Sequence, residues 1–103
     1  MTRWFDVASV DELSPGSCRV VDLDGMAVAV FHIGNEYYAI ADVCPHDGGD
    51  LASGKLVGEE IICPRHGARF SIRTGAVLAP PAYENLRIFP VRVAESKVQI
   101  ETE

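Results

Sequence analysis

The chain has 103 residues, which is enough for one small domain and leaves no room for a second core. Hydrophobic residues make up 48% and charged residues 23%, a balance that excludes an intrinsically disordered chain. The 15 acidic and 9 basic residues give a net charge of -6, which disfavours nucleic acids and anionic membrane surfaces as partners and favours a partner with a basic docking face. The longest apolar run, residues 26–33, is too short to span a bilayer. No apolar signal segment follows Met1, so we expect a cytoplasmic protein.

The first 41 residues consist of short strand-like segments separated by turn residues. Ser9 and Glu12 have the spacing of a capping box, which predicts one helical turn after the first strand. Asp24-Gly25 predicts a tight hairpin turn between two β-branched runs. The strands predicted in this part of the chain are residues 4–8, 18–23, 26–33 and 36–41.

Residues 42–75 have a different character, because glycine crowds into them. Only brief strands fit there, at residues 55–57, 60–62 and 68–71. Pro80-Pro81 predicts a rigid loop, and residues 86–94 and 97–101 predict a closing hairpin. No segment keeps a helical period over a useful length. The sequence therefore predicts a small all-β domain with a loop-rich insertion near its middle.

The insertion contains two short segments rich in metal-binding side chains, Cys44-Pro45-His46 and Cys63-Pro64-Arg65-His66. An odd total of three cysteines argues against a disulfide framework. Two thiols and two imidazoles at the start of two glycine-rich loops instead predict a metal site. The alternative is that the cysteines are small buried hydrophobic residues and the histidines ordinary loop residues, but finding both types paired twice by chance is improbable.

The arrangement of the four side chains bears on which metal they hold. A zinc finger pairs its thiols closely and its histidines closely. Here each loop supplies one thiol and one imidazole, which fits a binuclear iron site better, with two cysteines on one iron and two histidines on the other. A zinc-binding module without redox activity stays as an alternative.

These segments resemble the Rieske [2Fe-2S] box in its soluble bacterial ferredoxin form. The matching stretches are residues 44–51 and 63–70, and the likeness extends to residues 38–40, 73–75 and 80–82. The resemblance implies one Rieske-type [2Fe-2S] cluster per chain in a single Rieske domain, 1–103. It further implies an antiparallel β sandwich or barrel as a base, approximately residues 1–41 and 76–103, with a cluster-binding subdomain inserted at approximately residues 42–75.

The same resemblance assigns roles to individual side chains. Cys44 and Cys63 match the thiolate ligands of the inner iron, and His46 and His66 match the imidazole ligands of the outer, solvent-facing iron. The residues expected immediately around the cluster are Gly48, Arg65, Gly67, Ala68, Phe70 and Pro81.

Two departures from the family pattern are informative. Rieske proteins of cytochrome bc complexes join their loops with a disulfide, and this chain has Gly49 and Arg65 at those positions. High-potential members also carry a serine and a tyrosine whose hydroxyls donate hydrogen bonds to sulfur, where this chain has Ala68 and Phe70. Donors aimed at sulfur raise the potential of the cluster, so we expect a potential near the low end of the Rieske range of about -150 to +300 mV.

The remaining polar residues near the loops have simpler expected roles. Asp47 and Asp50 are interpreted as solvated turn carboxylates, and Arg65 either helps docking or is merely solvated. Cys18 is expected to be a half-buried packing residue, and His32 a structural one. Residues 44–73 carry four acidic and four basic side chains, so the negative charge lies on the rest of the domain.

The function implied is that of a soluble low-potential ferredoxin. It would carry single electrons from a flavin-dependent reductase to a terminal oxygenase, as a monomer with no catalytic residues of its own. The main alternative is the Rieske-like small subunit of an assimilatory nitrite reductase. Many such subunits lack the ligand set that this chain keeps whole, which disfavours that alternative.

Overall fold

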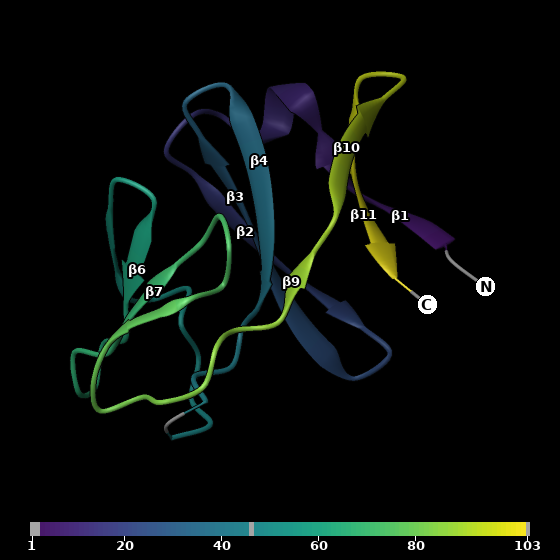
Figure 1. Ribbon diagram of the computed structural model, residues 1–103. Coiled ribbons are helices and arrows are strands. Elements are labelled where there is room, and N and C mark those ends of the chain that lie inside the picture. Colours follow the sequence, from purple (N-terminus) through teal and green to yellow (C-terminus); the bar gives the residue numbers. More distant parts are fainter. Residues whose placement is uncertain (1–2, 46, 103) are drawn as a thin grey trace.

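The computed structural model describes residues 3–45 and 47–102, which form three antiparallel sheets and one short 3₁₀ turn (Figure 1). The first sheet brings the two ends of the chain together in the order β1-β11-β10. Its strands are β1 (Arg3–Ser9), β10 (Val91–Ala94) and β11 (Lys97–Thr102). Among the described residues, no helix has the length and apolar character needed to cross a membrane.

The predicted helical turn after the first strand is confirmed as η1 (Val10–Glu12). The backbone N–H of Ser9 donates a hydrogen bond to Glu12 Oε1 at 2.9 Å. This bond holds the pKa of the Glu12 carboxyl below its usual value. The carboxylate therefore satisfies an amide at the start of the turn that would otherwise have no partner.

The second sheet has the order β2-β3-β4-β9 and forms the wall between the two halves of the molecule. Its strands are β2 (Cys18–Leu23), β3 (Met26–Ile33), β4 (Glu36–Ala41) and β9 (Ile88–Phe89). Sequential hairpins build the first three strands, with Leu23 paired to Met26 across the predicted Asp24-Gly25 turn.

The third sheet has the order β5-β6-β7-β8 and lies to one side of the second sheet (Figure 1). Its strands are β5 (Lys55–Val57), β6 (Glu60–Ile62), β7 (Arg69–Ser71) and β8 (Val77–Ala79). All four strands are only three residues long, so the sheet needs the packing beneath it to be stable.

The strand β3 is buried on both faces, and this decides how the halves join. Val28 and Val30 pack into a cluster against the first sheet, whereas Ala29 and Phe31 pack into a second cluster beneath the third sheet. Alternate residues of a strand point to opposite faces, so one strand supplies both cores. Burial on both faces also explains why residues 26–33 form a continuous apolar run rather than an alternating one.

Two details of the fold differ from the sequence prediction. The strand β8 was not predicted, and it extends the third sheet to Ala79. The single strand predicted at residues 86–94 is two strands, because the chain passes at Pro90 from β9 in the second sheet to β10 in the first. Proline has no N–H to give to a ladder, so it marks this change of partner.

Gly75 offers a sharp test of the packing between the third sheet and the following loop. Its φ is +79°, and a β-carbon added to it would lie 2.5 Å from the carbonyl oxygen of Leu86. Gly34 has a φ of +61° but nothing within 4 Å of the same position, so Gly34→Ala measures the backbone cost alone.

We expect Gly75→Ala to cost about 1–3 kcal/mol more than Gly34→Ala, because an overpacked contact adds to the left-handed backbone penalty. In a domain of this size each 1 kcal/mol lowers the melting temperature by about 4–8 °C. Thermal unfolding followed by circular dichroism checks the difference. Equal melting temperatures for the two variants would contradict the close approach at Gly75.

Candidate metal centre

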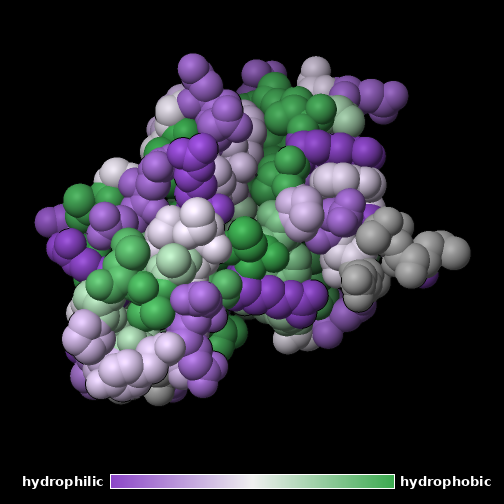
Figure 2. Space-filling model, viewed as in Figure 1, coloured by the Kyte–Doolittle hydropathy of each residue, from purple (hydrophilic) through white to green (hydrophobic). Residues whose placement is uncertain are grey.

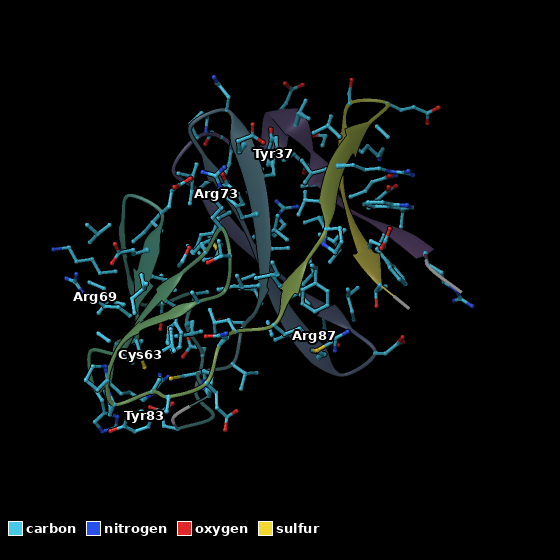
Figure 3. The ribbon with its side chains drawn as sticks, viewed as in Figure 1. Tyr37, Cys63, Arg69, Arg73, Tyr83 and Arg87 are labelled. Carbon is cyan, nitrogen blue, oxygen red and sulfur yellow. The ribbon has the colours of Figure 1, made fainter. Side chains whose placement is uncertain are left out.

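Two loops at one end of the molecule bring the two predicted thiol ligands together. The first loop follows β4 and carries Cys44, and the second follows β6 and carries Cys63. Both residues are almost completely inaccessible to solvent, and both belong to the apolar cluster beneath the third sheet. Figure 3 labels Cys63 and the exposed Tyr83 in this part of the molecule.

The separation of the sulfur atoms is suitable for a shared metal. The Sγ atoms of Cys44 and Cys63 and a carboxylate oxygen of Asp47 all lie within 4.8 Å of one another. Two thiolates on one tetrahedral metal lie about 3.8 Å apart, from metal–sulfur bonds of about 2.3 Å. The two sulfur atoms can therefore meet on one metal with little movement of the loops.

Both loops fold into the same turn, which presents each cysteine in the same way. The N–H of Gly48 donates to the carbonyl of Cys44 at 2.8 Å, and the N–H of Gly67 donates to the carbonyl of Cys63 at 3.1 Å. Each glycine has a φ of +77°, a conformation that side chains with a β-carbon disfavour. The spacing Cys-x-x-x-Gly, present in both loops, is the sequence signal for this shared turn.

One further backbone hydrogen bond closes each turn. The N–H of Cys44 donates to the carbonyl of Gly49 at 2.7 Å, and the N–H of Cys63 donates to the carbonyl of Ala68 at 2.8 Å. These bonds satisfy the backbone close to the thiols without using the sulfur atoms. The peptide groups of both cysteines are thus paired within their own loops.

The two predicted imidazole ligands differ in how much the structure says of them. His46 lies outside the described residues. The side chain of His66 is 55% exposed, and its Nδ1 lies 3.4 Å from Asp47 Oδ2. A predicted outer ligand therefore reaches the surface, while both predicted inner ligands are buried.

Asp47 lies in an exposed turn, as interpreted from the sequence, but its carboxylate is paired as well. Its side chain is only 17% exposed and lies between the two loops. Arg65 Nε donates to Asp47 Oδ2 at 2.6 Å, and the N–H of Gly49 donates to Asp47 Oδ1 at 2.9 Å. The hydrogen bond from Arg65 holds the pKa of the Asp47 carboxyl well below its usual range. Arg65 is accordingly paired with the first loop and not merely solvated.

The other residues expected near the cluster lie close to the cysteines along the chain or in the same core. Ala68 and Phe70 are fully buried in the apolar cluster that contains both thiols. Pro81 is half-buried and follows a cis peptide bond with Pro80, and Ala82 belongs to the same cluster as the cysteines.

Two residues outside the loops complete the comparison with the sequence. Cys18 is exposed on β2, so its predicted half-buried packing role is wrong. His32 stacks on Tyr37 with ring centroids 4.1 Å apart, and its Nδ1 lies 2.8 Å from the carbonyl oxygen of Leu13. These contacts confirm a structural role for His32. None of the three cysteines, all of which are described, forms a disulfide.

A buried carboxylate that the sequence interpretation missed anchors the first loop. Asp42 Oδ1 accepts hydrogen bonds from the N–H groups of Leu51 at 2.7 Å and Ala52 at 2.8 Å. Leu51 is fully buried in the cluster with the cysteines, so Asp42 closes the loop that carries Cys44. An acidic residue directly after a predicted strand was the available sequence signal.

Comparison with known proteins agrees with this geometry. A family model of the Rieske [2Fe-2S] domain matches residues 3–90. The ferredoxin component of the naphthalene 1,2-dioxygenase/salicylate 5-hydroxylase systems of Ralstonia sp is 31% identical over 101 residues, which cover 98% of this chain and 97% of the relative.

Two solved structures extend the comparison. A chain in the complex of reduced oxygenase and oxidized ferredoxin in carbazole 1,9a-dioxygenase is 35% identical, with a TM-score of 0.89 over 94% of this chain and 91% of that chain. A structure described as an NADH-dependent nitrite reductase small subunit from Mycobacterium tuberculosis is 25% identical, with a TM-score of 0.84 over 100% of this chain and 97% of that chain.

The chain therefore belongs to the Rieske [2Fe-2S] domain family. Its cofactor is a Rieske-type [2Fe-2S] cluster. The residues present fit this group, because two buried thiols from separate loops lie within reach of one metal and the second loop also carries an exposed imidazole, that of His66. When bound, such a cluster supplies reversible one-electron chemistry.

Substitution of Asp42 tests how the first loop is held. We expect Asp42→Ala to destabilise the protein by about 1–3 kcal/mol for each amide that loses its acceptor. Asp42→Asn keeps an acceptor oxygen and serves as the matched control, with a smaller loss. Urea unfolding of both variants measures the difference. If Asn and Ala at this position were equally destabilising, the two hydrogen bonds would not be what holds the loop.

Proposed function

We propose that this protein is a Rieske-type ferredoxin that carries single electrons from a flavin-dependent reductase to a terminal oxygenase. The observation that carries the proposal is the pair of buried thiols brought together from two loops, in a chain of the Rieske family. The names of its relatives support it, because they are ferredoxin components of dioxygenase systems. We assign the chain no catalytic role of its own.

The ligand roles follow from the two motifs. We assign Cys44 and Cys63 to the inner iron, and His46 and His66 to the outer iron. The buried thiolates fix the cluster in the apolar core, and the His66 side chain connects the site with the surface. The subdomain that binds the cluster then contains both loops and the third sheet, and the other two sheets serve as its base.

The surface beside the second loop suits brief contact with a partner protein. Tyr83 is 85% exposed and Leu78 is 51% exposed, and both line an open hollow of about 350 Å³. Figure 2 shows hydrophobic residues gathered on the part of the molecule that contains the third sheet. The balanced charge of residues 44–73 leaves this end nearly neutral, so we infer that docking of the oxygenase depends on apolar contact here.

The proposed function also bears on the oligomeric state and on the cellular compartment. We expect a monomer, because the protein has to meet a reductase and an oxygenase in turn. Cysteines that serve as cluster ligands also suit a reducing compartment such as the cytoplasm.

The small subunit of a nitrite reductase is the alternative function, since one such structure shares the fold at 25% identity. A direct test mixes the reduced protein with the oxidised oxygenase of carbazole 1,9a-dioxygenase and follows the visible absorbance in a stopped-flow instrument. Rapid reoxidation supports the ferredoxin function. No reoxidation, together with co-purification with a sirohaem enzyme, would support the nitrite reductase instead.

Variants of the proposed ligands test the assignment of the cluster site. We expect Cys63→Ser to abolish the visible and EPR spectra of the cluster, and His66→Cys or His46→Ala to abolish the Rieske EPR signature. Cys18→Ser is the matched control and keeps both spectra, because Cys18 lies on β2 outside the loops. A colourless wild-type protein with one equivalent of zinc would contradict the assignment.

The reduction potential of the cluster can be used to test the role of Ala68. A hydroxyl aimed at sulfur stabilises the extra negative charge of the reduced cluster, so we expect Ala68→Ser to raise the reduction potential. The wild-type value is expected near the low end of about -150 to +300 mV. Redox titration monitored by circular dichroism measures both proteins. An unchanged potential in a folded Ala68→Ser variant would show that missing donors do not set the low value.

A further inference from the structure

The side chain of Arg65 occupies the space that a side chain at position 49 would need. A β-carbon added to Gly49 would lie 2.7 Å from Arg65 Nε and would collide with the rest of the guanidinium. Gly49 does not have a positive φ, so its backbone conformation does not itself require glycine. The guanidinium therefore lies directly against the backbone of the first loop, and glycine is what leaves room for it.

Arg65 belongs to the second loop, but its strongest contacts are with the first. Its Nε donates to Asp47 Oδ2 at 2.6 Å, and its Nη2 donates to the carbonyl oxygen of Asp50 at 2.7 Å. Its Nη1 also lies 3.4 Å from Asp50 Oδ1. The planar guanidinium can make these forked contacts with one loop all at once, whereas an ammonium group cannot.

The same group reaches the proposed ligands. Arg65 Nη2 lies 3.5 Å from Cys63 Sγ, and Asp47 Oδ2 lies 3.9 Å from the same sulfur and 3.4 Å from His66 Nδ1. The side chain of Arg65 is 33% exposed, which reduces screening of its charge by solvent. A positive charge beside a thiolate ligand favours the more negative, reduced state of a cluster.

We propose that Arg65 is a positioning residue that joins the two loops and tunes the cluster through Cys63. The proposal rests on the ligand assignment made under the proposed function. It adds a role for a side chain that is not a ligand, and it explains the pairing of Arg65 with Gly49. The junction is non-covalent and consists of Arg65 with Asp47 and Asp50.

The first experiment compares Arg65→Met with Arg69→Met in the cluster-loaded protein. Arg69 lies on β7 in the third sheet and pairs with Glu60 on β6 at 3.6 Å, so its side chain does not join the two loops. Loss of the visible absorbance in excess chelator gives the rate of cluster release. We expect Arg65→Met to release the cluster about 10- to 100-fold faster than wild type, and Arg69→Met to match wild type.

The reduction potential separates positioning from general stability. We expect Arg65→Met to lower the potential, because the positive charge beside Cys63 is lost while both carboxylates stay. Arg65→Lys keeps the positive charge but not the planar guanidinium. We therefore expect it to release the cluster faster than wild type, and to lower the reduction potential less than Arg65→Met does. If Arg65→Met left both release and potential unchanged but slowed electron delivery to the oxygenase, Arg65 would be a docking residue and the proposal would be overturned.

A covalent replacement provides the rescue. Removing the guanidinium frees the space beside position 49, so Gly49→Cys combined with Arg65→Cys places two thiols opposite each other. Oxidation by added diamide removes two hydrogens and forms one disulfide, while the diamide is reduced to the hydrazine. We expect the cross-linked protein to release its cluster within a few-fold of the wild-type rate.

Each outcome of the rescue bears on the proposal. Mass spectrometry of the intact chain, alkylated after denaturation, reports the cross-link. A double variant that does not cross-link would contradict the adjacency of the loops at these positions. A cross-linked protein that still releases its cluster at the Arg65→Met rate would show that joining the loops is not the role of Arg65. A wild-type protein without a Rieske spectrum would instead defeat the ligand assignment itself.

Discussion

The structure depends on burying two thiols from different loops in one apolar cluster. Cys44 and Cys63 are 19 positions apart, and neither loop can form the site alone. A thiolate in such surroundings is unstable without a compensating charge, so the apolar cluster and the metal centre require each other. The two loops also share one turn geometry, in which the N–H and the carbonyl of each cysteine are paired within its own loop.

Charge is distributed to match this arrangement. The chain carries a net charge of -6, yet the segment from residue 44 to residue 73 is balanced. Within it, the carboxylate of Asp47 in the first loop pairs with Arg65 in the second. Acidic side chains near the metal centre thus serve the internal order of the loops, and the acidity of the rest of the domain is left to govern long-range encounters.

The cofactor could be predicted from the sequence, because the paired motifs carry metal-binding residue types at a characteristic spacing. Most strands could be predicted too, because their turns contain Asp24-Gly25 and similar signals. The contacts of Arg65 could not, since they join residues 15 and 18 positions apart that only the folded loops bring together. The break at Pro90 was visible as a residue, but its consequence, a change of sheet, depends on which strands lie on either side.

The burial of β3 on both faces bears on whether the loops and the third sheet could exist apart from the rest of the domain. The apolar cluster that contains both thiols includes Ala29, Phe31 and Ile40, which belong to the second sheet. A fragment with only the loops and the third sheet would lack these three side chains and would expose the apolar surface around both thiols. The two loops and the third sheet therefore depend on the second sheet for their packing and are not a portable module. Transplanting it into another protein would require a host sheet with small and large residues alternating in the same register.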